Sequence, residues 1–152
     1  MARSKIKKAS SLEKYKPHAV VKEDAESFMN DRPSWRFKNM DMTGEWSLNL
    51  AEEKEREKVF SRLSNFEKMT WREIFKDCNN ENHMIDPSDL TKKAQDRMDE
   101  LKRYEDRIVS LRIEAQKRIY GFMYGSVCEI IWYDNKHGDT DECVCRSHKK
   151  HT

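Results

Sequence analysis

The chain has 152 residues, of which 38% are charged, and its 30 basic and 28 acidic residues give a formal net charge of +2 at pH 7. This length predicts one domain with a modest core. Because the basic and acidic residues are nearly equal in number, the net charge by itself identifies no partner. The sequence contains neither a secretory h-region nor a run of about 18 apolar residues, which predicts a cytoplasmic protein without a membrane span.

The start of the chain is strongly basic. Residues 1–16 carry six basic side chains and a single acidic one, Glu13. We therefore expect residues 1–34 to form a basic, flexible arm. Such an arm either contacts RNA or a ribosome through phosphate groups or is simply solvated, and its composition is compatible with both.

The first structured segment, residues 34–50, alternates apolar and polar side chains, which predicts extended structure with one or two short strands about Gly44. A helix is expected over residues 51–69, because Val59, Leu63 and Phe66 recur on one helical face. Its acidic first turn favours the same assignment.

Two further helices are expected before the strand-like segments that begin at residue 108. The sequence TWRE, residues 70–73, has the form of a capping box and predicts a short helix that directs Trp71 inward. Residues 78–89 then form a loop, and a third helix begins near Asp86. Its apolar stripe is formed by Leu90, Ala94, Met98 and Leu101.

Residues 108–113, 117–124 and 127–134 are rich in branched and aromatic side chains and predict three antiparallel strands. Gly125 and Ser126 fit a two-residue hairpin of type II′. The overall expectation is an α+β fold, in which an N-terminal strand and helices pack on a C-terminal antiparallel sheet of three to four strands.

The hairpin register predicts that the last two strands differ in their two faces. Uninterrupted pairing places Tyr120 opposite Ile131 and Arg118 opposite Tyr133. One face is then free of charge and forms the core: Ile119, Gly121, Met123, Cys128, Ile130 and Trp132. The other is an exposed aromatic surface: Arg118, Tyr120, Phe122, Tyr124, Glu129, Ile131 and Tyr133. We expect a partner, or the N-terminal segment, to cover this aromatic surface.

The order of these elements, together with SLRIEAQKRIYGFMYGSVCEIIWYDNKH, resembles the RelE/ParE superfamily of bacterial type II toxins. The resemblance covers residues 35–137, followed by a polar C-terminal tail, residues 138–152. It implies a toxin that blocks translation by ribosome-dependent mRNA cleavage, with a cognate antitoxin as partner and the ribosome or mRNA as target. ParE-like members share the fold but act through protein contacts, so a non-catalytic interaction protein is the alternative.

The resemblance also implies site residues. Arg118 matches the arginine that stabilises charge on the phosphate, and His137 matches the basic residue after the next strand that acts as acid or base. The expected substrate contacts are Arg112, Lys117, Tyr120, Tyr133 and Lys136. Metal-independent cleavage requires no cofactor. Without the resemblance, an arginine on an exposed strand face is usually a solvated or salt-bridged residue, and a histidine in a turn is more often a surface residue than a catalyst.

The cysteines suggest little chemistry. Without a secretion signal they are expected to be reduced. Cys128 lies within the apolar stretch and is predicted to be a core residue. Cys143, Cys145, His148 and His151 supply ligand types that zinc prefers, but their spacing is tighter than that of a zinc finger. No metal site is predicted.

Overall fold

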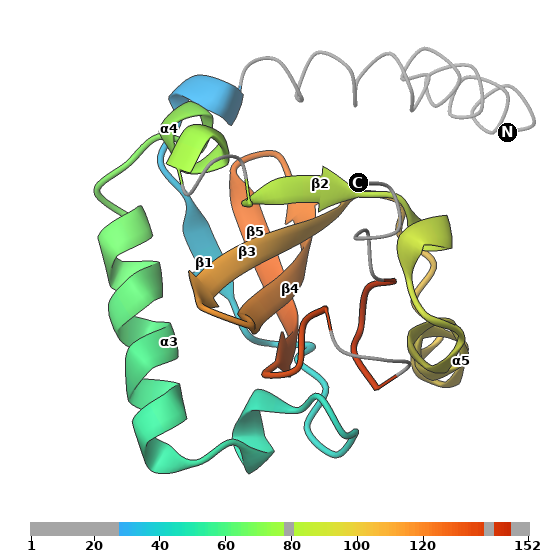
Figure 1. Cartoon of the computed structure of the whole chain (residues 1–152). Helices are drawn as coiled ribbons and strands as arrows, with labels where there is room; N and C mark the ends of the chain where they lie inside the picture. Colours follow the sequence, from blue (N-terminus) through green and yellow to red (C-terminus); the bar gives the residue numbers. More distant parts are fainter. Residues whose placement is uncertain (1–27, 78–80, 139–141, 147–152) are drawn as a thin grey trace, which may run out of the picture.

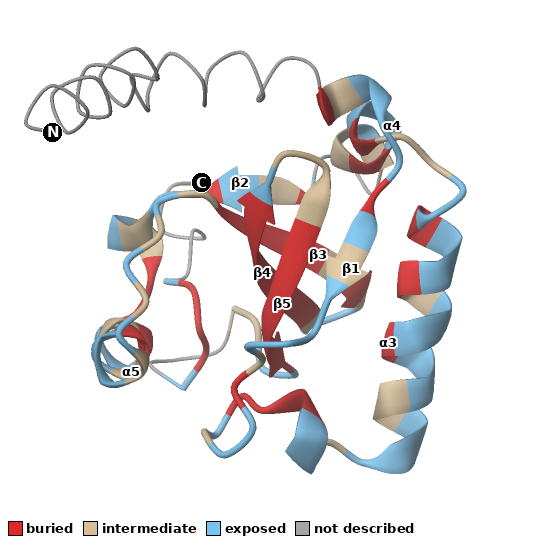
Figure 2. Ribbon diagram, turned by 180° about the vertical axis from the view of Figure 1, so that it is seen from behind, coloured by how far each residue is buried: buried red, intermediate tan, exposed pale blue. Residues whose placement is uncertain are grey.

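The computed structural model describes residues 28–77, 81–138 and 142–146. A central sheet separates two layers, with α3 and α4 over one face and α5 over the other (Figures 1 and 2). The strands are buried along most of their length in Figure 2, and each face of the sheet therefore has its own core.

The sheet has five strands in the order β1-β5-β4-β3-β2. Its centre is the predicted meander of β3 (Ile108–Glu114), β4 (Lys117–Tyr124) and β5 (Val127–Asp134), in which neighbouring strands are antiparallel. At the edges, β1 (Ser34–Arg36) lies parallel to β5, and β2 (His83–Ile85) lies antiparallel to β3. The prediction of α+β structure is confirmed, whereas that of an antiparallel sheet of three to four strands is wrong, because the sheet is mixed and has five.

The first core lies under α3 (Glu53–Phe66) and α4 (Trp71–Lys76), both of which were predicted. Thr70 and Glu73 form the expected capping box of α4. Two short 3₁₀ helices, η1 (Phe28–Asn30) and η2 (Leu48–Leu50), complete this layer. Residues around Gly44 form a turn rather than a strand.

The second core lies under η4 (Pro87–Asp89), α5 (Lys92–Leu101) and residues 142–146. It buries the predicted stripe of α5 against Tyr120, Phe122 and Trp132. Tyr120 is 0% exposed and Phe122 is 1% exposed. The predicted aromatic surface is therefore not a surface, because the chain's own helix covers it where we expected a partner or the N-terminal segment.

The packed part of the chain extends beyond both predicted boundaries. Phe28, assigned to the basic arm, lies against Trp71 and Phe75. Cys143 and Cys145, assigned to the polar tail, are buried, and Val144 packs in the second core. Residues 1–16 lie outside the described part of the chain.

The hairpin register is confirmed from Tyr124↔Val127 to Gly121↔Ile130 and then shifts by one residue. Gly125 has a φ of +60°, as the predicted turn requires. Beyond Gly121 a β-bulge in β5 pairs Tyr120 with Trp132 and Arg118 with Asp134. Trp132 consequently joins the second core and Tyr133 joins the first, which reverses the faces predicted for these two residues.

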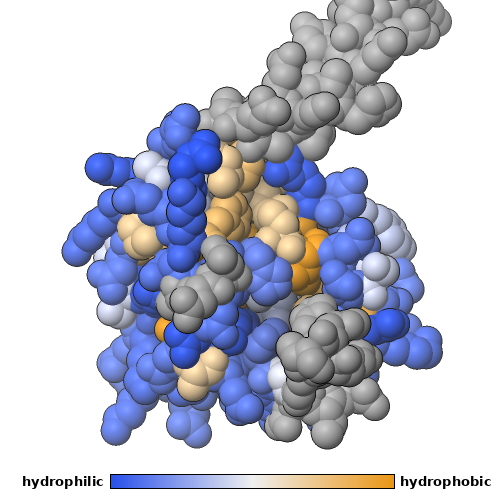
Figure 3. All heavy atoms as spheres, turned by 45° about the horizontal axis from the view of Figure 1, so that its top comes forward, coloured by the Kyte–Doolittle hydropathy of each residue, from blue (hydrophilic) through white to orange (hydrophobic). Residues whose placement is uncertain are grey.

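The surface reflects the charged composition. On the face shown in Figure 3, hydrophilic side chains dominate, and apolar side chains gather near the centre. Within the described residues, no helix combines the length and apolar character needed to cross a bilayer.

A buried carboxylate, Asp41, connects α5 to Trp132 of the second core. Arg97 of α5 donates to both of its oxygens (2.7 and 2.8 Å), and the indole Nε1 of Trp132 donates to Oδ2 (2.9 Å). Backbone N–H groups of Thr43 and Gly44 donate to Oδ1. Burial raises the pKa of Asp41, but these hydrogen bonds outweigh it and hold the pKa well below its ordinary value.

Replacing Gly121 with alanine should destabilise the fold, because a Cβ at this position would lie 2.5 Å from Cys128 Sγ and 2.8 Å from the carbonyl oxygen of Glu129. We expect Gly121→Ala to cost about 1–3 kcal/mol of unfolding free energy in urea denaturation. Ser64→Ala, at an exposed position of α3, is the matched control and should change stability by less than about 0.5 kcal/mol. Equal stability of the two variants would contradict the close packing at Gly121.

Asp41 should make the protein sensitive to acid. A carboxylate whose pKa is lowered by folding stabilises the native state above its unfolded pKa, and this contribution is lost as pH falls. We expect the unfolding free energy to fall between about pH 5 and pH 2, and less steeply in Asp41→Asn. At pH 7 this variant should lose about 2–4 kcal/mol, because the negative charge beside Arg97 is removed and an NH₂ group replaces Oδ2, the acceptor of Arg97 Nε and Trp132 Nε1. Parallel pH profiles of the two proteins would exclude this role.

Candidate functional site

Two arginines face each other at one end of the sheet. Arg112 of β3 and Arg118 of β4 are directly paired, and we refer to them as the arginine pair. Like charges placed opposite each other on a sheet repel, so such a pair requires a counter-charge. That counter-charge comes from outside the two strands.

Glu81, just before β2, spans the arginine pair. Its Oε2 lies 3.1 Å from Arg112 Nε, and its Oε1 lies 3.7 Å from Arg118 Nη2. The neighbouring Asn82 is buried and holds this segment in place, since its side chain donates to the Ile74 carbonyl (2.9 Å) and accepts from the Arg112 N–H (2.7 Å). The Glu81 side chain is 45% exposed, so its contact with the arginines can exchange with solvent or with a ligand.

The two arginines differ in their access to solvent. The Arg118 side chain is only 6% exposed, whereas that of Arg112 is 32% exposed. Arg118 Nη1 donates to the carbonyls of Ala115 (2.5 Å) and Lys117 (3.1 Å), which leaves Nη2 directed at Glu81. Burial lowers the pKa of Arg118, and nearby Glu81 opposes this effect; an arginine still keeps its charge at neutral pH.

His137 lies beside the turn between β3 and β4, which also supplies the Ala115 carbonyl that Arg118 contacts. Its backbone N–H donates to the Gln116 carbonyl (3.0 Å), next to the carbonyl that Arg118 contacts. Its Nδ1 is 3.2 Å from the Tyr120 hydroxyl. Burial raises the pKa of Tyr120 well above its ordinary value. The hydroxyl therefore keeps its proton and can donate to Nδ1, which leaves Nε2 of a neutral His137 protonated.

Asp134 fixes the segment that carries His137. It is buried opposite Arg118 and accepts from the backbone N–H groups of Lys136 (2.8 Å) and Val144 (2.9 Å). Burial raises the pKa of Asp134, and the two hydrogen bonds act in the other direction. Through them, one carboxylate holds both the turn after β5 and residues 142–146.

The structure brings together four of the seven predicted site residues: Arg112, Arg118, Tyr120 and His137. Two others lie on the α3 face of the sheet. Lys117 is near Glu55 of α3, and Tyr133 packs in the first core, because the bulge turns it away from Arg118. Lys136 is exposed just after β5.

Sequence reasoning missed Glu81, Asn82 and Asp134. Glu81 and Asn82 lie in a segment predicted as loop, and nothing in their spacing relates them to arginines about thirty positions later. Asp134 was visible as a carboxylate at a strand end. Its place opposite Arg118 depends on the bulge, which the alternating pattern of β5 does not reveal.

The cluster combines cationic donors with an imidazole, the groups needed to bind a phosphodiester and to move a proton. Among residues 28–77, 81–138 and 142–146, no group of three or more His, Cys, Asp or Glu side chains is arranged to hold a metal ion. Cys143 Sγ donates to the Cys145 carbonyl (2.9 Å). His148 and His151 lie outside the described residues.

Comparisons with family models, with curated proteins and with solved structures found no match to this chain.

Proposed function

We propose that the protein binds RNA at the arginine pair and cleaves it without a metal ion, as a translation-blocking toxin of the RelE/ParE type. The observation that carries this proposal is the position of Glu81, whose carboxylate oxygens lie against both arginines. A phosphate group presents oxygens of similar charge and spacing, and guanidinium groups bind both anions.

The different solvent exposure of Arg112 and Arg118 supports different roles for them in binding a phosphate. Arg112, the more exposed arginine, contacts the phosphate first, and Glu81 moves aside. Arg118 Nη2 then donates to a phosphate oxygen where it now faces Glu81. Its Nη1 stays bound to the backbone carbonyls, so the guanidinium is already oriented for the transition state.

His137 supplies the proton transfer. The ribose 2′-oxygen attacks the adjacent phosphorus, a new O–P bond forms, and the bond from phosphorus to the 5′-oxygen breaks. A water molecule accepts the 2′-hydroxyl proton, and His137 protonates the leaving 5′-oxygen. His137 acts as the acid in its imidazolium form, in which Nδ1–H donates to the Tyr120 hydroxyl oxygen and Nε2–H protonates the 5′-oxygen, which leaves a neutral imidazole; Tyr120 is its positioning residue.

The alternative, a protein that acts by presenting its aromatic face to a host factor or antitoxin, lacks the expected surface. Tyr120 and Phe122 are buried under α5 and only Tyr124, at 44% exposure, remains accessible. An antitoxin partner stays a proposal that follows from the resemblance, and it would have to bind elsewhere.

Substitutions of Glu81 and of Arg112 should change the affinity for RNA in opposite directions. Glu81→Gln removes a competing negative charge, and we expect RNA to bind about 3–10-fold more tightly. Arg112→Ala should weaken binding and reduce the magnitude of the salt slope by about 1. The measurement is fluorescence anisotropy of a labelled single-stranded RNA at several salt concentrations.

Lys92→Ala, which removes an 88% exposed cation on α5, controls for the change in net charge. It should have a smaller effect than Arg112→Ala. If Glu81→Gln does not tighten binding and Arg112→Ala behaves like the control, the arginine pair is not a phosphate site.

Cleavage should depend on Arg118 and His137. We expect Arg118→Lys, which keeps the charge but loses the planar fork, and His137→Gln each to lower the rate by about 10²-fold or more. Tyr120→Phe should retain activity but change its pH profile, because His137 loses the group that orients its ring. The measurement is primer extension on ribosome-bound mRNA.

Circular dichroism would verify that each variant is folded. Full cleavage by both Arg118→Lys and His137→Gln would refute the assigned roles. Absence of cleavage and of growth arrest with the parent protein would refute the ribonuclease proposal itself.

A further inference from the structure

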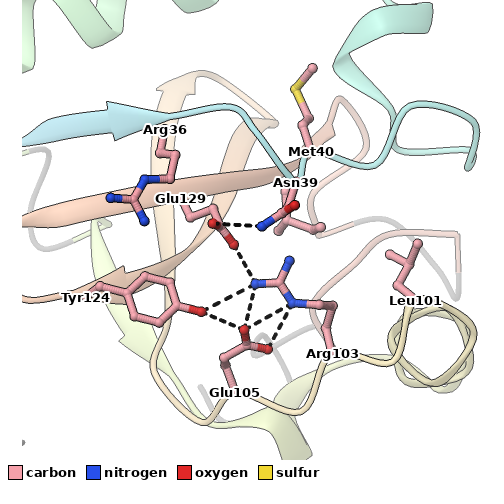
Figure 4. Close-up of a pocket in the computed structure, with 9 residues that line it drawn as sticks. Arg36, Asn39, Met40, Leu101, Arg103, Glu105, Tyr124 and Glu129 are labelled. Atoms are coloured by element: carbon pink, nitrogen blue, oxygen red, sulfur yellow. Dashed lines mark hydrogen bonds and ion pairs between the residues drawn. The ribbon is translucent and has the colours of Figure 1, made fainter.

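A second polar site lies on the same side of the sheet, at the far end of β4 from the arginine pair. We call it the Tyr124 pocket; its volume is about 580 Å³ and it is lined by Arg36, Asn39, Met40, Leu101, Arg103, Glu105, Tyr124, Glu129 and Ile131 (Figure 4). Tyr124 and Arg118 are six residues apart on one strand, which separates the two sites by about 20 Å. A pocket of this size accommodates a small organic molecule.

One arginine organises the wall of this pocket. Arg103 Nε and Nη2 donate to Glu105 (2.6–3.2 Å), and Nη2 also donates to the buried Glu129 (2.5 Å). The guanidinium lies over the Phe122 ring at 4.5 Å. Asn39 donates to the other oxygen of Glu129 (3.2 Å). Both carboxylates are thus already bound to a fixed cation, which leaves them poorly suited to hold a metal ion.

The hydrogen-bonding groups that remain unused in the pocket are mainly donors. Arg36 makes no ion pair or side-chain hydrogen bond with the residues that the structure describes, although it is the direct neighbour of Glu129 in the sheet. Arg103 Nη1 likewise has no acceptor among them. Figure 4 shows Arg36 and Tyr124 on the same side of the pocket, with Leu101 and Met40 beyond Arg103 and Asn39. An anionic ligand group is therefore expected near Arg36.

Tyr124 offers a flat surface beside this cation. Its hydroxyl donates to Glu105 (2.6 Å) and lies 3.4 Å from Arg103 Nη2, while the residue remains 44% exposed. A ring held by such hydrogen bonds loses little further freedom when a planar group stacks on it. The pocket thus combines an anchored aromatic ring, a polar wall and a cation that has no ion pair within the described part of the chain.

We propose that the Tyr124 pocket binds a single nucleotide, with its phosphate at Arg36 and its base stacked on Tyr124. The Asn39 amide oxygen lies along the wall and accepts a hydrogen bond from the edge of the base. A small phosphate ester without a base would lose the stacking, and a nucleoside without a phosphate would lose the ion pair. This second site goes beyond the proposed function, because it would bind a free nucleotide whether or not the arginine pair binds RNA.

The test is isothermal titration of the full chain with guanosine 5′-monophosphate at low salt. We expect saturable 1:1 binding, about 10-fold weaker for guanosine and for ribose 5-phosphate. Arg36→Ala should weaken binding by about 10-fold, whereas Lys38→Ala removes an exposed cation two residues away that does not line the pocket and should have little effect. Tyr124→Leu should weaken binding and Tyr124→Phe, which keeps the ring, should do so less.

Two further measurements separate this site from the arginine pair. Arg112→Ala should bind the mononucleotide as the parent does, and Arg36→Ala should weaken binding of a single-stranded RNA only if RNA, rather than a free nucleotide, supplies the ligand. Equal affinity of Arg36→Ala and the parent, or no saturable binding up to about 5 mM nucleotide, would overturn the proposal. Neither result would bear on cleavage at Arg118 and His137.

Discussion

One extra residue in β5 determines how the rest of the structure is arranged. After Gly121 has paired with Ile130, the next pair joins Tyr120 to Trp132, so the residues that follow change face. Trp132 thereby enters the second core, where its indole N–H reaches Asp41, and Asp41 in turn binds Arg97 of α5. Without the bulge, Ile131 would lie opposite Tyr120 in place of Trp132, and Tyr133 would lie opposite Arg118 in place of Asp134. The packing of α5 and the charge balance around Arg118 therefore depend on the same local irregularity.

The covering of the second face also determines where function can occur. α5 and residues 142–146 close the middle of this face, where the side chains are apolar or aromatic and their burial stabilises the fold. Partly accessible polar groups lie toward its two ends, with the arginine pair at one and the Tyr124 pocket at the other. Arg103 lies at the boundary between the buried middle of this face and the polar pocket at its end. Its guanidinium contacts the buried Phe122 ring and also forms part of the pocket wall.

Local patterns predicted the parts of this fold that depend on local interactions. The capping box at Thr70, the face of α3 formed by Val59 and Leu63, and the tight turn at Gly125 follow from periodicity and turn chemistry. The parallel contact of β1 with β5, the three residues of β2 and the bulge arise from pairing between distant segments, which no short window contains. The site divides in the same way. The position of Arg118 and His137 at the same end of the sheet follows from antiparallel strand order, whereas the contact with Glu81 and the face of Tyr133 follow from tertiary structure.

The counter-charges of the arginine pair differ in whether a ligand can replace them. Asp134 is buried and held by two backbone N–H groups, so its removal would leave those groups and Arg118 without an acceptor. Glu81 is nearly half exposed and has no such backbone partners within the described residues, so it gives up little when it leaves the arginines for water. In the proposed binding of an anion to both guanidinium groups, Glu81 is therefore a group that the anion displaces. The hydrogen bonds of Asp134 to the backbone of Lys136 and Val144 do not involve Glu81, so the segment of His137 keeps its position when Glu81 leaves the arginines.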